Sequence, residues 1–200
     1  MDEIIISMQN WNEIRFNSST LISLFKNKSG FVLDLSLFPP EIPLHAYAAV
    51  KDNKLGFYVI SEENDIESPE DELMHNCFWF PCSTIALELS NTQKLKESLF
   101  LENQISEEEA LKRINFWKEE AEQWIMQAVN IPDGIYHCFF IPTQGMEPEM
   151  HNVYFTLNGD DDEKVADLVL QSISGSFYDT VCARPPFPPD VSNYYMHSLI

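Results

Sequence analysis

The longest amphipathic segment of the chain lies near its middle, at residues 105–129. Its apolar side chains recur at spacings of three and four residues, which places them on one face of an α-helix. These residues are Leu111, Ile114, Trp117, Ala121, Trp124, Ile125 and Ala128. Ser106 and Glu109 have the spacing of a capping box, and Pro132-Asp133-Gly134 follows as a stop signal. The pattern predicts a helix over about 106–129 whose tryptophans pack into a core.

Runs rich in β-branched and aromatic residues on both sides of this helix predict strands. They span residues 3–8, 31–38, 44–50, 55–60, 77–80 and 84–89 before the helix, and 135–141 and 152–157 after it. The polar residues 51–54 predict a hairpin turn between two of these strands. A short helix is expected after Asn17, and residues 91–99 form a short polar helix at most. The run 165–173 fits a helix or a buried strand.

Strand-rich segments flanking one long helix predict an α+β fold. We expect a mainly antiparallel, mixed-order sheet packed against helix 106–129, in a single domain spanning residues 1–200. Met74-His75-Asn76 recurs as Met150-His151-Asn152, which leaves open a duplication with halves 1–104 and 105–182. The proline-rich tail, residues 183–200, should be irregular or extended.

The order of motifs from residue 105 to about residue 190 resembles a group of uncharacterised bacterial proteins of Bacteroidetes type. The motifs are an I-S-x-E-E-A helix, an F-x-I-P strand, a Y-x-x-L-x-G strand, an apolar strand and Tyr178-Asp179 before a proline-rich tail. The chain has Arg184-Pro185-Pro186 where the group usually reads C-P-P. The resemblance implies that 165–173 is a strand, and it brings no known activity.

Negative charge dominates the composition. The formal net charge is −20, from 32 acidic against 12 basic residues. No Lys or Arg occurs between Lys54 and Lys94, and only Lys164 and Arg184 follow Lys118. Such a surface repels nucleic-acid phosphates and anionic lipid, so we expect neither as a partner. The absence of a signal-peptide pattern and of a run of 18 apolar residues predicts a soluble, cytoplasmic protein.

Motifs that carry chemistry are sparse. The four cysteines have no C-x-x-C spacing and are interpreted as reduced thiols: Cys77, Cys82, Cys138 and Cys182. His137 and Cys138 are sequential in a predicted strand and point to opposite faces, so we expect no metal site there or at His75 with Cys77. Phosphate-binding and nucleophile motifs do not occur in the sequence, so we assign no catalytic residue and expect no cofactor.

Two acidic segments supply the candidate partner-binding residues. They are Glu62, Glu63, Asp65, Glu67, Glu70, Asp71, Glu72, Asp160, Asp161 and Asp162. The first segment, 61–72, should be an exposed loop that repels itself unless a basic surface meets it. Our first hypothesis is therefore a non-enzymatic binding protein, of inhibitor or immunity type, that docks a basic protein. An alternative interpretation is that the acidic surface only keeps the chain soluble.

Two alternatives from other classes stay open. One is a small hydrolase that uses carboxylate and histidine groups, with Asp34, Glu41 and His45 as one acid–base set. The other is a structural or assembly subunit whose proline-rich tail binds a neighbouring chain. A cleft with converging histidines and carboxylates would favour the hydrolase, and a flat acidic patch would favour the binding protein.

Overall fold

The computed structural model describes residues 1–87, 104–159, 164–179, 181–185 and 193–200. Their helices are α1 (Asp2–Ile14), α2 (Ser18–Phe25), α3 (Glu70–Asn76) and α4 (Glu107–Ala128), with short 3-10 turns η1 (Leu35–Leu37), η2 (Glu62–Asn64) and η3 (Tyr195–Leu199). Their strands are β1 (Gly30–Asp34), β2 (Leu44–Lys51), β3 (Lys54–Ser61), β4 (Phe78–Pro81), β5 (Gln104–Ile105), β6 (Cys138–Ile141), β7 (Met150–Asn158), β8 (Val165–Ser172), β9 (Phe177–Tyr178) and β10 (Cys182–Arg184).

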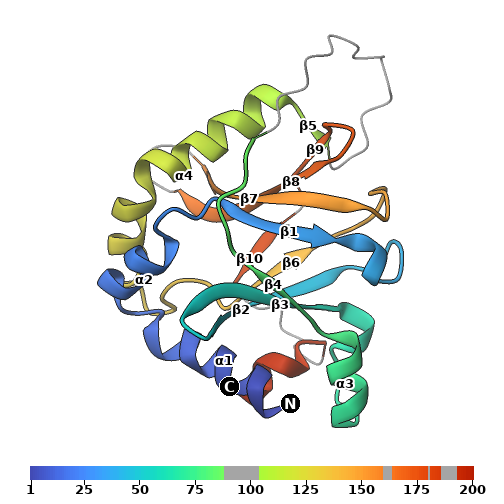
Figure 1. Cartoon of the computed structure of the whole chain (residues 1–200). Coiled ribbons are helices and arrows are strands. Elements are labelled where there is room, and N and C mark those ends of the chain that lie inside the picture. Colours follow the sequence, from blue (N-terminus) through green and yellow to red (C-terminus); the bar gives the residue numbers. More distant parts are fainter. Residues whose placement is uncertain (88–103, 160–163, 180, 186–192) are drawn as a thin grey trace.

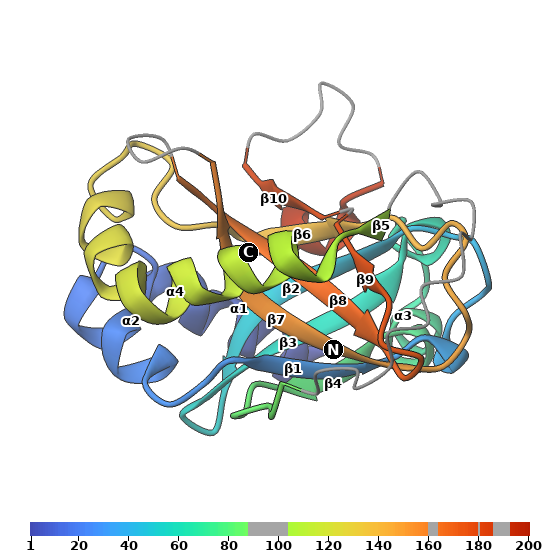
Figure 2. The same cartoon turned by 90° about the horizontal axis from the view of Figure 1, so that it is seen from above.

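These strands form two antiparallel sheets, and the fold is α+β as predicted. The first sheet has the order β1-β7-β8-β9-β5 and the second the order β10-β6-β2-β3-β4, both visible in Figures 1 and 2. Each sheet therefore combines strands from before and after the central helix. We expected a single sheet against that helix, and the structure instead divides the strands between two.

The main core lies between the two sheets. Phe31 of β1 packs on Phe57 of β3 with ring centroids 4.8 Å apart, and Phe57 lies 6.2 Å from Phe155 of β7. Trp117 of α4 enters the same core, with its ring 5.3 Å from that of Phe155. Burial of such aromatic side chains contributes the largest apolar areas of a small domain, so this layer holds the sheets together.

The prediction of the central helix is confirmed. The hydroxyl of Ser106 caps α4 by accepting a hydrogen bond from the Glu109 amide at 3.2 Å. Trp117 and Ile125 are buried in the main core, while Ala110 packs near the first turn in a smaller apolar cluster with Phe177. One apolar stripe thus serves two clusters, because the helix crosses from the outer edge of the first sheet to the core.

The predicted hairpin at residues 44–60 is also confirmed. Strands β2 and β3 pair in register up to Lys51 opposite Lys54. Asp52 and Asn53 form the turn with φ of 50° and 59°, the left-handed conformation that Asn and Asp tolerate best. Every residue of β2 except Lys51 is buried, since the strand is covered on both faces.

The prediction of a strand at residues 3–8 is wrong, because this segment belongs to helix α1. Ile4, Met8 and Trp11 recur at helical spacing over a longer window and are all buried. Ile4 and Met8 pack on the outer face of the second sheet, and Trp11 packs into the main core. The indole Nε1 of Trp11 donates to the carbonyl of Tyr136 at 2.9 Å. The short run of isoleucines has high β-propensity, but burial of this helical face overrides it.

Two other strands are shorter than predicted because side chains occupy their backbone groups. The strand expected at 135–141 begins only at Cys138, since Arg15 takes the carbonyl of Ile135 and Trp11 that of Tyr136. The strand expected at 31–38 ends at Asp34, whose carboxylate accepts from the Ser36 amide to start η1. At the start of β6 and the end of β1, hydrogen bonds with side chains thus replace the backbone hydrogen bonds of a longer strand.

The predictions for the remaining segments are confirmed in some cases and wrong in others. No strand forms at residues 84–87, and the backbone N–H and C=O of Ile85 bond to the side chain of Ser29. Residues 88, 89 and the proposed helix at 91–99 lie outside the described residues. The segment 165–173 is a strand, β8. The predicted irregular tail includes β10 and η3, and residues 186–192 lie outside the described residues.

None of the helices found in the described residues combines the length and the apolar character that a bilayer span requires.

Candidate functional site

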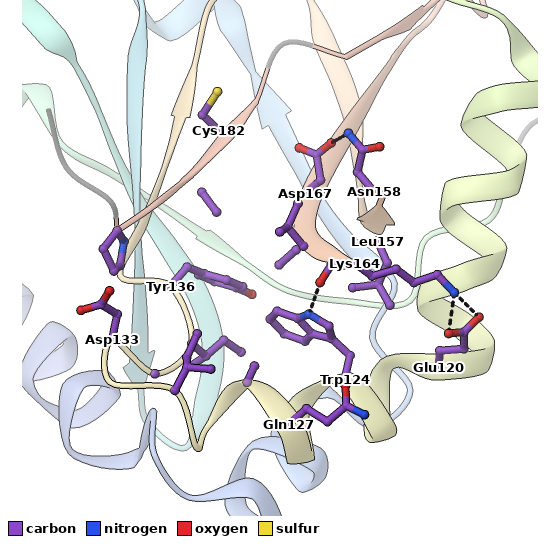
Figure 3. A pocket seen from close by; sticks show the side chains of 18 of the residues that line it. Glu120, Trp124, Gln127, Asp133, Tyr136, Leu157, Asn158, Lys164, Asp167 and Cys182 are labelled. Carbon is purple, nitrogen blue, oxygen red and sulfur yellow. Dashed lines mark hydrogen bonds and ion pairs between the residues drawn. The ribbon is translucent and has the colours of Figure 1, made fainter. Parts of the chain in front are cut away.

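A cavity of about 760 Å³ opens where the C-terminal half of α4 meets the ends of both sheets (Figure 3). We call it the α4 cavity. Its walls come from α4, the loop that follows it, the end of β7, the start of β8, and β10 with its flanking residues. The lining residues used below are Glu120, Trp124, Val165, Tyr136, Asn158, Lys164, Asp167, Asp133 and Cys182. Elements distant in sequence thus converge on one hollow.

Two aromatic side chains are held in place in this wall. The indole Nε1 of Trp124 donates to the carbonyl of Lys164 at 3.0 Å, which ties α4 to the start of β8. The ring of Tyr136 stacks on Trp11 at a centroid distance of 5.8 Å and contacts Phe139 at 4.3 Å. The Tyr136 hydroxyl is buried and has no hydrogen-bond partner among the described residues. Because both rings are anchored from behind, they form a preorganised apolar surface.

An ion pair closes one side of the α4 cavity. The ammonium of Lys164 lies 2.8 and 2.7 Å from the two carboxylate oxygens of Glu120 (Figure 3). The same ammonium lies 4.1 Å from the centroid of the Phe116 ring, within range of a cation–π contact. The side chain of Lys164 is only 8% exposed. This lysine is therefore committed to α4 and its charge is compensated.

A second polar group lies further along the same wall, around Asp167 of β8. Its Oδ1 accepts from the Leu168 amide at 2.8 Å. Its Oδ2 lies 3.3 Å from the Asn158 amide nitrogen and 3.4 Å from a guanidinium nitrogen of Arg113. The same nitrogen of Arg113 lies 2.6 Å from Asp179. Arg113 therefore gives its closest contact to Asp179 and only a long one to Asp167.

This arrangement changes the acidity of Asp167. Burial, the largest cause, and the neighbouring Asp179 carboxylate together raise the pKa of its carboxyl to about 7. Arg113 and the Leu168 amide act against this shift but do not cancel it. Arg113 also binds Glu109 at 2.8 Å, so one guanidinium serves three carboxylates. Asp167 consequently titrates near neutral pH on the cavity wall.

Cys182 marks the mouth of the α4 cavity. All four cysteines are free and lie in the described part of the chain, and Cys182 is the exposed one. Burial raises the pKa of the Cys77, Cys82 and Cys138 thiols, which keeps them protonated. Asp133 and Val165 are also exposed at this opening. A thiol reagent should therefore reach the cavity mouth selectively.

The predicted acidic segment 61–72 is placed differently from expectation. It contains η2 and the start of α3 rather than a continuous loop. Five of its acids are exposed and Glu62 is half-buried; the exposed ones are Glu63, Glu67, Glu70, Asp71 and Glu72. The assignment of Asp65 to an exposed binding surface is wrong, since this residue is completely buried. Asp160, Asp161 and Asp162 lie outside the described residues.

Asp65 instead belongs to an internal polar cluster with His45. The two side chains lie 2.7 Å apart and neither is exposed. The ring of Tyr194 stacks on His45 at a centroid distance of 4.0 Å. A histidine–carboxylate pair sealed in this way meets no substrate. The proposed acid–base set with Asp34 has no such proximity to support it, because the Asp34 carboxylate caps η1.

Two other candidate metal ligands, His137 and Cys138, contact neighbouring side chains. Cys138 packs in the apolar cluster on the outer face of the second sheet. The ring of His137 lies 4.8 Å from that of His197. Within the described residues, no group of three or more His, Cys, Asp or Glu side chains is placed to hold a metal ion.

Sequence reasoning missed the residues around Asp167. A signal was present, since Asp167 and Gln171 interrupt an otherwise apolar run in β8 and both are buried. A buried carboxylate in such a strand requires a partner, and Arg113 of α4 was the available cation. The convergence of these residues with Trp124 and Tyr136 depended on the packing of α4 against β7 and β8.

Comparisons of the chain with models of protein families, with curated proteins and with solved structures found no match. The resemblance to the Bacteroidetes-type group stays a prediction.

Proposed function

We propose that the protein is a binding protein whose α4 cavity accommodates a small organic molecule with a flat apolar body. The observation that carries this proposal is the cavity of about 760 Å³ with two anchored aromatic rings and a few polar groups in its wall. Sites for small molecules typically have volumes of about 300–1,000 Å³ and this kind of lining.

The rigidity of the walls supports the proposal. Trp124, Tyr136 and Lys164 each have contacts that fix their side chains in the absence of a ligand. A ligand that entered would therefore cause little loss of side-chain freedom, which favours affinity. The polar groups at Glu120 and Asp167 flank the apolar surface, so they can orient a ligand rather than merely enclose it (Figure 3).

Cys182 offers a direct test of cavity occupancy. The protein is titrated with Nile red, a neutral fluorescent probe of apolar sites, and the alkylation rate of Cys182 by N-ethylmaleimide is followed by mass spectrometry. We expect Nile red to bind with enhanced emission and to slow alkylation of Cys182 at the cavity mouth.

Two valine substitutions provide matched variants for this test. Val165→Trp adds an indole at the cavity wall, whereas Val32→Trp adds the same group on β1, away from the cavity; the two valines are 58% and 42% exposed. Val165→Trp should weaken Nile red binding by about tenfold or more, since it occupies ligand volume. Val32→Trp should leave it unchanged. Equal binding by both variants, or no protection of Cys182, would reject the cavity as the site.

A second candidate function is the docking of a basic protein on the acidic surface at the N-terminal end of α1 and at α3. Its support is a convergence that the sequence did not show. The Met1 amine lies 3.0 Å from Glu70, which places the N-terminal end of α1, where Asp2 is exposed, beside the acids of α3 (Figure 1). Exposed Ile6 and Met74 on the same two helices add apolar area. Complementary charge would act mainly on the association rate.

Two triple variants, each of which neutralises three exposed acids, test this second candidate. Glu70→Gln, Asp71→Asn and Glu72→Gln remove the exposed acids of α3, while Glu108→Gln, Glu119→Gln and Glu122→Gln remove three exposed acids of α4. A partner recovered by pulldown should associate at least about tenfold more slowly with the α3 variant at low ionic strength. Equal rates for both variants and the wild type, at low and high salt, would reduce this surface to a solubility feature.

A further inference from the structure

We propose that the molecule bound in the α4 cavity is a cation, with an amine on its flat apolar body, and that Asp167 recognises the amine. This inference rests on the proposed cavity function, and it adds the charge of the ligand and the residue that recognises this charge.

The charges of the cavity lining favour a cation. Its charged lining residues are three acids, Glu120, Asp133 and Asp167, and one base, Lys164. Lys164 is paired with Glu120, so these two cancel. Behind the wall, Arg113 serves Glu109 and Asp179 at close range, and Arg15 donates to the backbone carbonyls of Asp133 and Ile135. A deficit of positive charge therefore remains on the side of Asp167.

The hydrogen bonds of Asp167 leave room for a stronger donor. Its Oδ1 has a contact of ordinary length, 2.8 Å, with the Leu168 amide. Both nitrogen contacts of its Oδ2, at 3.3 and 3.4 Å, are longer than the usual N–H···O distance of about 2.9–3.0 Å, and its carboxyl also shares a side-chain hydrogen bond with Asp179. A ligand ammonium would approach a carboxylate to about 2.7–2.9 Å and form the charge-assisted bond that Arg113 supplies elsewhere.

The apolar part of the ligand has a defined place beside this carboxylate. Trp124 and Asp167 both line the cavity; in Figure 3 the Asp167 carboxyl lies beside Asn158, above Trp124, and Tyr136 lies toward the β10 side. The buried Tyr136 hydroxyl, which has no partner among the described residues, adds an unused polar group at the same wall. An aromatic amine whose ring lies at Trp124 and Tyr136 can therefore direct its ammonium to Asp167.

The protonation of Asp167 makes recognition depend on pH. The groups that face its carboxyl are Arg113 of α4, Asn158 of β7 and Asp179 after β9. With a pKa of about 7, the carboxyl is neutral in acid and charged above neutrality. The attraction for a cation should consequently be weak at about pH 5.5 and strong at about pH 8.5.

The test uses three probes that share one ring system: 2-naphthylmethylamine, 2-naphthylmethanol and 2-naphthoate. Their affinities for the whole protein are measured by calorimetry, with protection of Cys182 from alkylation as the second readout. At about pH 8.5 the amine should bind at least about tenfold more tightly than the alcohol, as expected for a hydrogen bond to a charged group. The carboxylate should bind least tightly, and the amine's advantage should shrink at about pH 5.5.

Asp167→Asn and Asp133→Asn are the matched variants. Both remove one carboxylate of the cavity lining, but Asp133 is exposed to solvent and Asp167 is buried. Asp167→Asn should abolish the amine's advantage and its pH dependence while the alcohol keeps its affinity within about twofold. Asp133→Asn should lower the amine's affinity by less than about threefold, because water screens an exposed charge.

The outcomes separate this inference from the proposal that it extends. Equal binding of amine and alcohol at about pH 8.5, or an advantage that survives in Asp167→Asn, overturns the assignment of a cation and leaves the cavity function standing. Failure of all three naphthyl probes and of Nile red to bind overturns both.

Discussion

The side chains of His45 and Asp65 lie 2.7 Å apart in the interior, and neither has any exposed surface. Asp65 also accepts a hydrogen bond from the Tyr47 hydroxyl at 2.5 Å and another from the Met196 amide at 2.9 Å. One carboxylate therefore joins β2, the residue after η2 and the C-terminal turn η3. Its position explains why the second sheet is covered on its outer face by the end of the chain.

Asp65→Ala should lower the free energy of unfolding by about 3–5 kcal/mol, the range for removing one partner from a buried hydrogen-bonded cluster around a carboxylate. The loss arises because Tyr47, His45 and the Met196 amide all lose their acceptor. Urea denaturation measures it. Glu63→Ala, an exposed acid two residues away, is the control and should change stability by less than about 0.5 kcal/mol. A similar small effect for both variants would contradict the role given to Asp65.

Trp117→Ala should destabilise the protein by about 3–5 kcal/mol because it leaves a large cavity in the core. The indole is 4% exposed and contacts the rings of Phe25 at 5.2 Å and Phe155 at 5.3 Å. A denaturant melt of this variant is compared with that of Lys118→Ala, the exposed next residue on α4. A loss below about 0.5 kcal/mol for Trp117→Ala would mean that this side chain does not support the core.

Asp167 should make stability fall as pH rises from about 4 to about 7. Its ordinary pKa is 3.8, and burial raises the pKa in the folded protein to about 7. Between these values the folded state keeps a proton that the unfolded state has lost, so a higher pH favours unfolding. The stabilising contribution of protonated Asp167 is fully present below the lower pKa, 3.8, and is lost as pH rises through the upper pKa, about 7.

Asp167→Asn, which resembles the protonated side chain, isolates this effect. The unfolding free energy of this variant minus that of the wild type should increase by up to about 1.4 kcal/mol per pH unit across this window. Above the window this difference should become constant. Urea melts at several pH values measure the difference, with Asp52→Asn on the exposed hairpin turn as the control for loss of a carboxylate. A difference that stays constant with pH would show that burial does not raise the pKa of the Asp167 carboxyl.

The hairpin turn should respond to substitution at Asn53, which has a φ of 59°. Asn53→Ala should cost about 1 kcal/mol, because a Cβ without a local hydrogen-bonding group is unfavourable in the left-handed region. Asn53→Gly should be neutral or slightly stabilising, since glycine adopts this conformation freely. Thermal melts of the two variants check the order, and the reverse order would mean that the turn is not the left-handed one described.

The local patterns of the chain were sufficient for several elements. The capped helix α4, the β2–β3 hairpin, α2 and most of β7 could be predicted, because caps, turn residues and periodicity act within a few residues. Helix α1 was predicted wrongly because the window at residues 3–8 was too short to reveal the spacing of Ile4, Met8 and Trp11. Tertiary burial of that face, rather than propensity, decided the structure there.

Contacts between distant segments decided the remaining features. The start of β6 depends on which carbonyls Arg15 and Trp11 of the α1 region take. The burial of Asp65 depends on His45, Tyr47 and Met196, and no short window contains these partners.

The candidate site is the clearest case of this division. Amphipathicity alone placed Trp117 and Trp124 on one face of a helix, but it could not distinguish the core position of the first from the cavity position of the second. That difference arises because α4 extends past the packed centre of the sheets, where β8, β10 and the loop after the helix enclose a space. Similarly, sequence shows Asp167 as an acid in an apolar strand, while only its burial beside Asp179, which the long contact to Arg113 opposes without cancelling, raises its pKa to about 7. Local sequence sets which face of an element is apolar, whereas desolvation and charge coupling depend on neighbours that folding alone brings together.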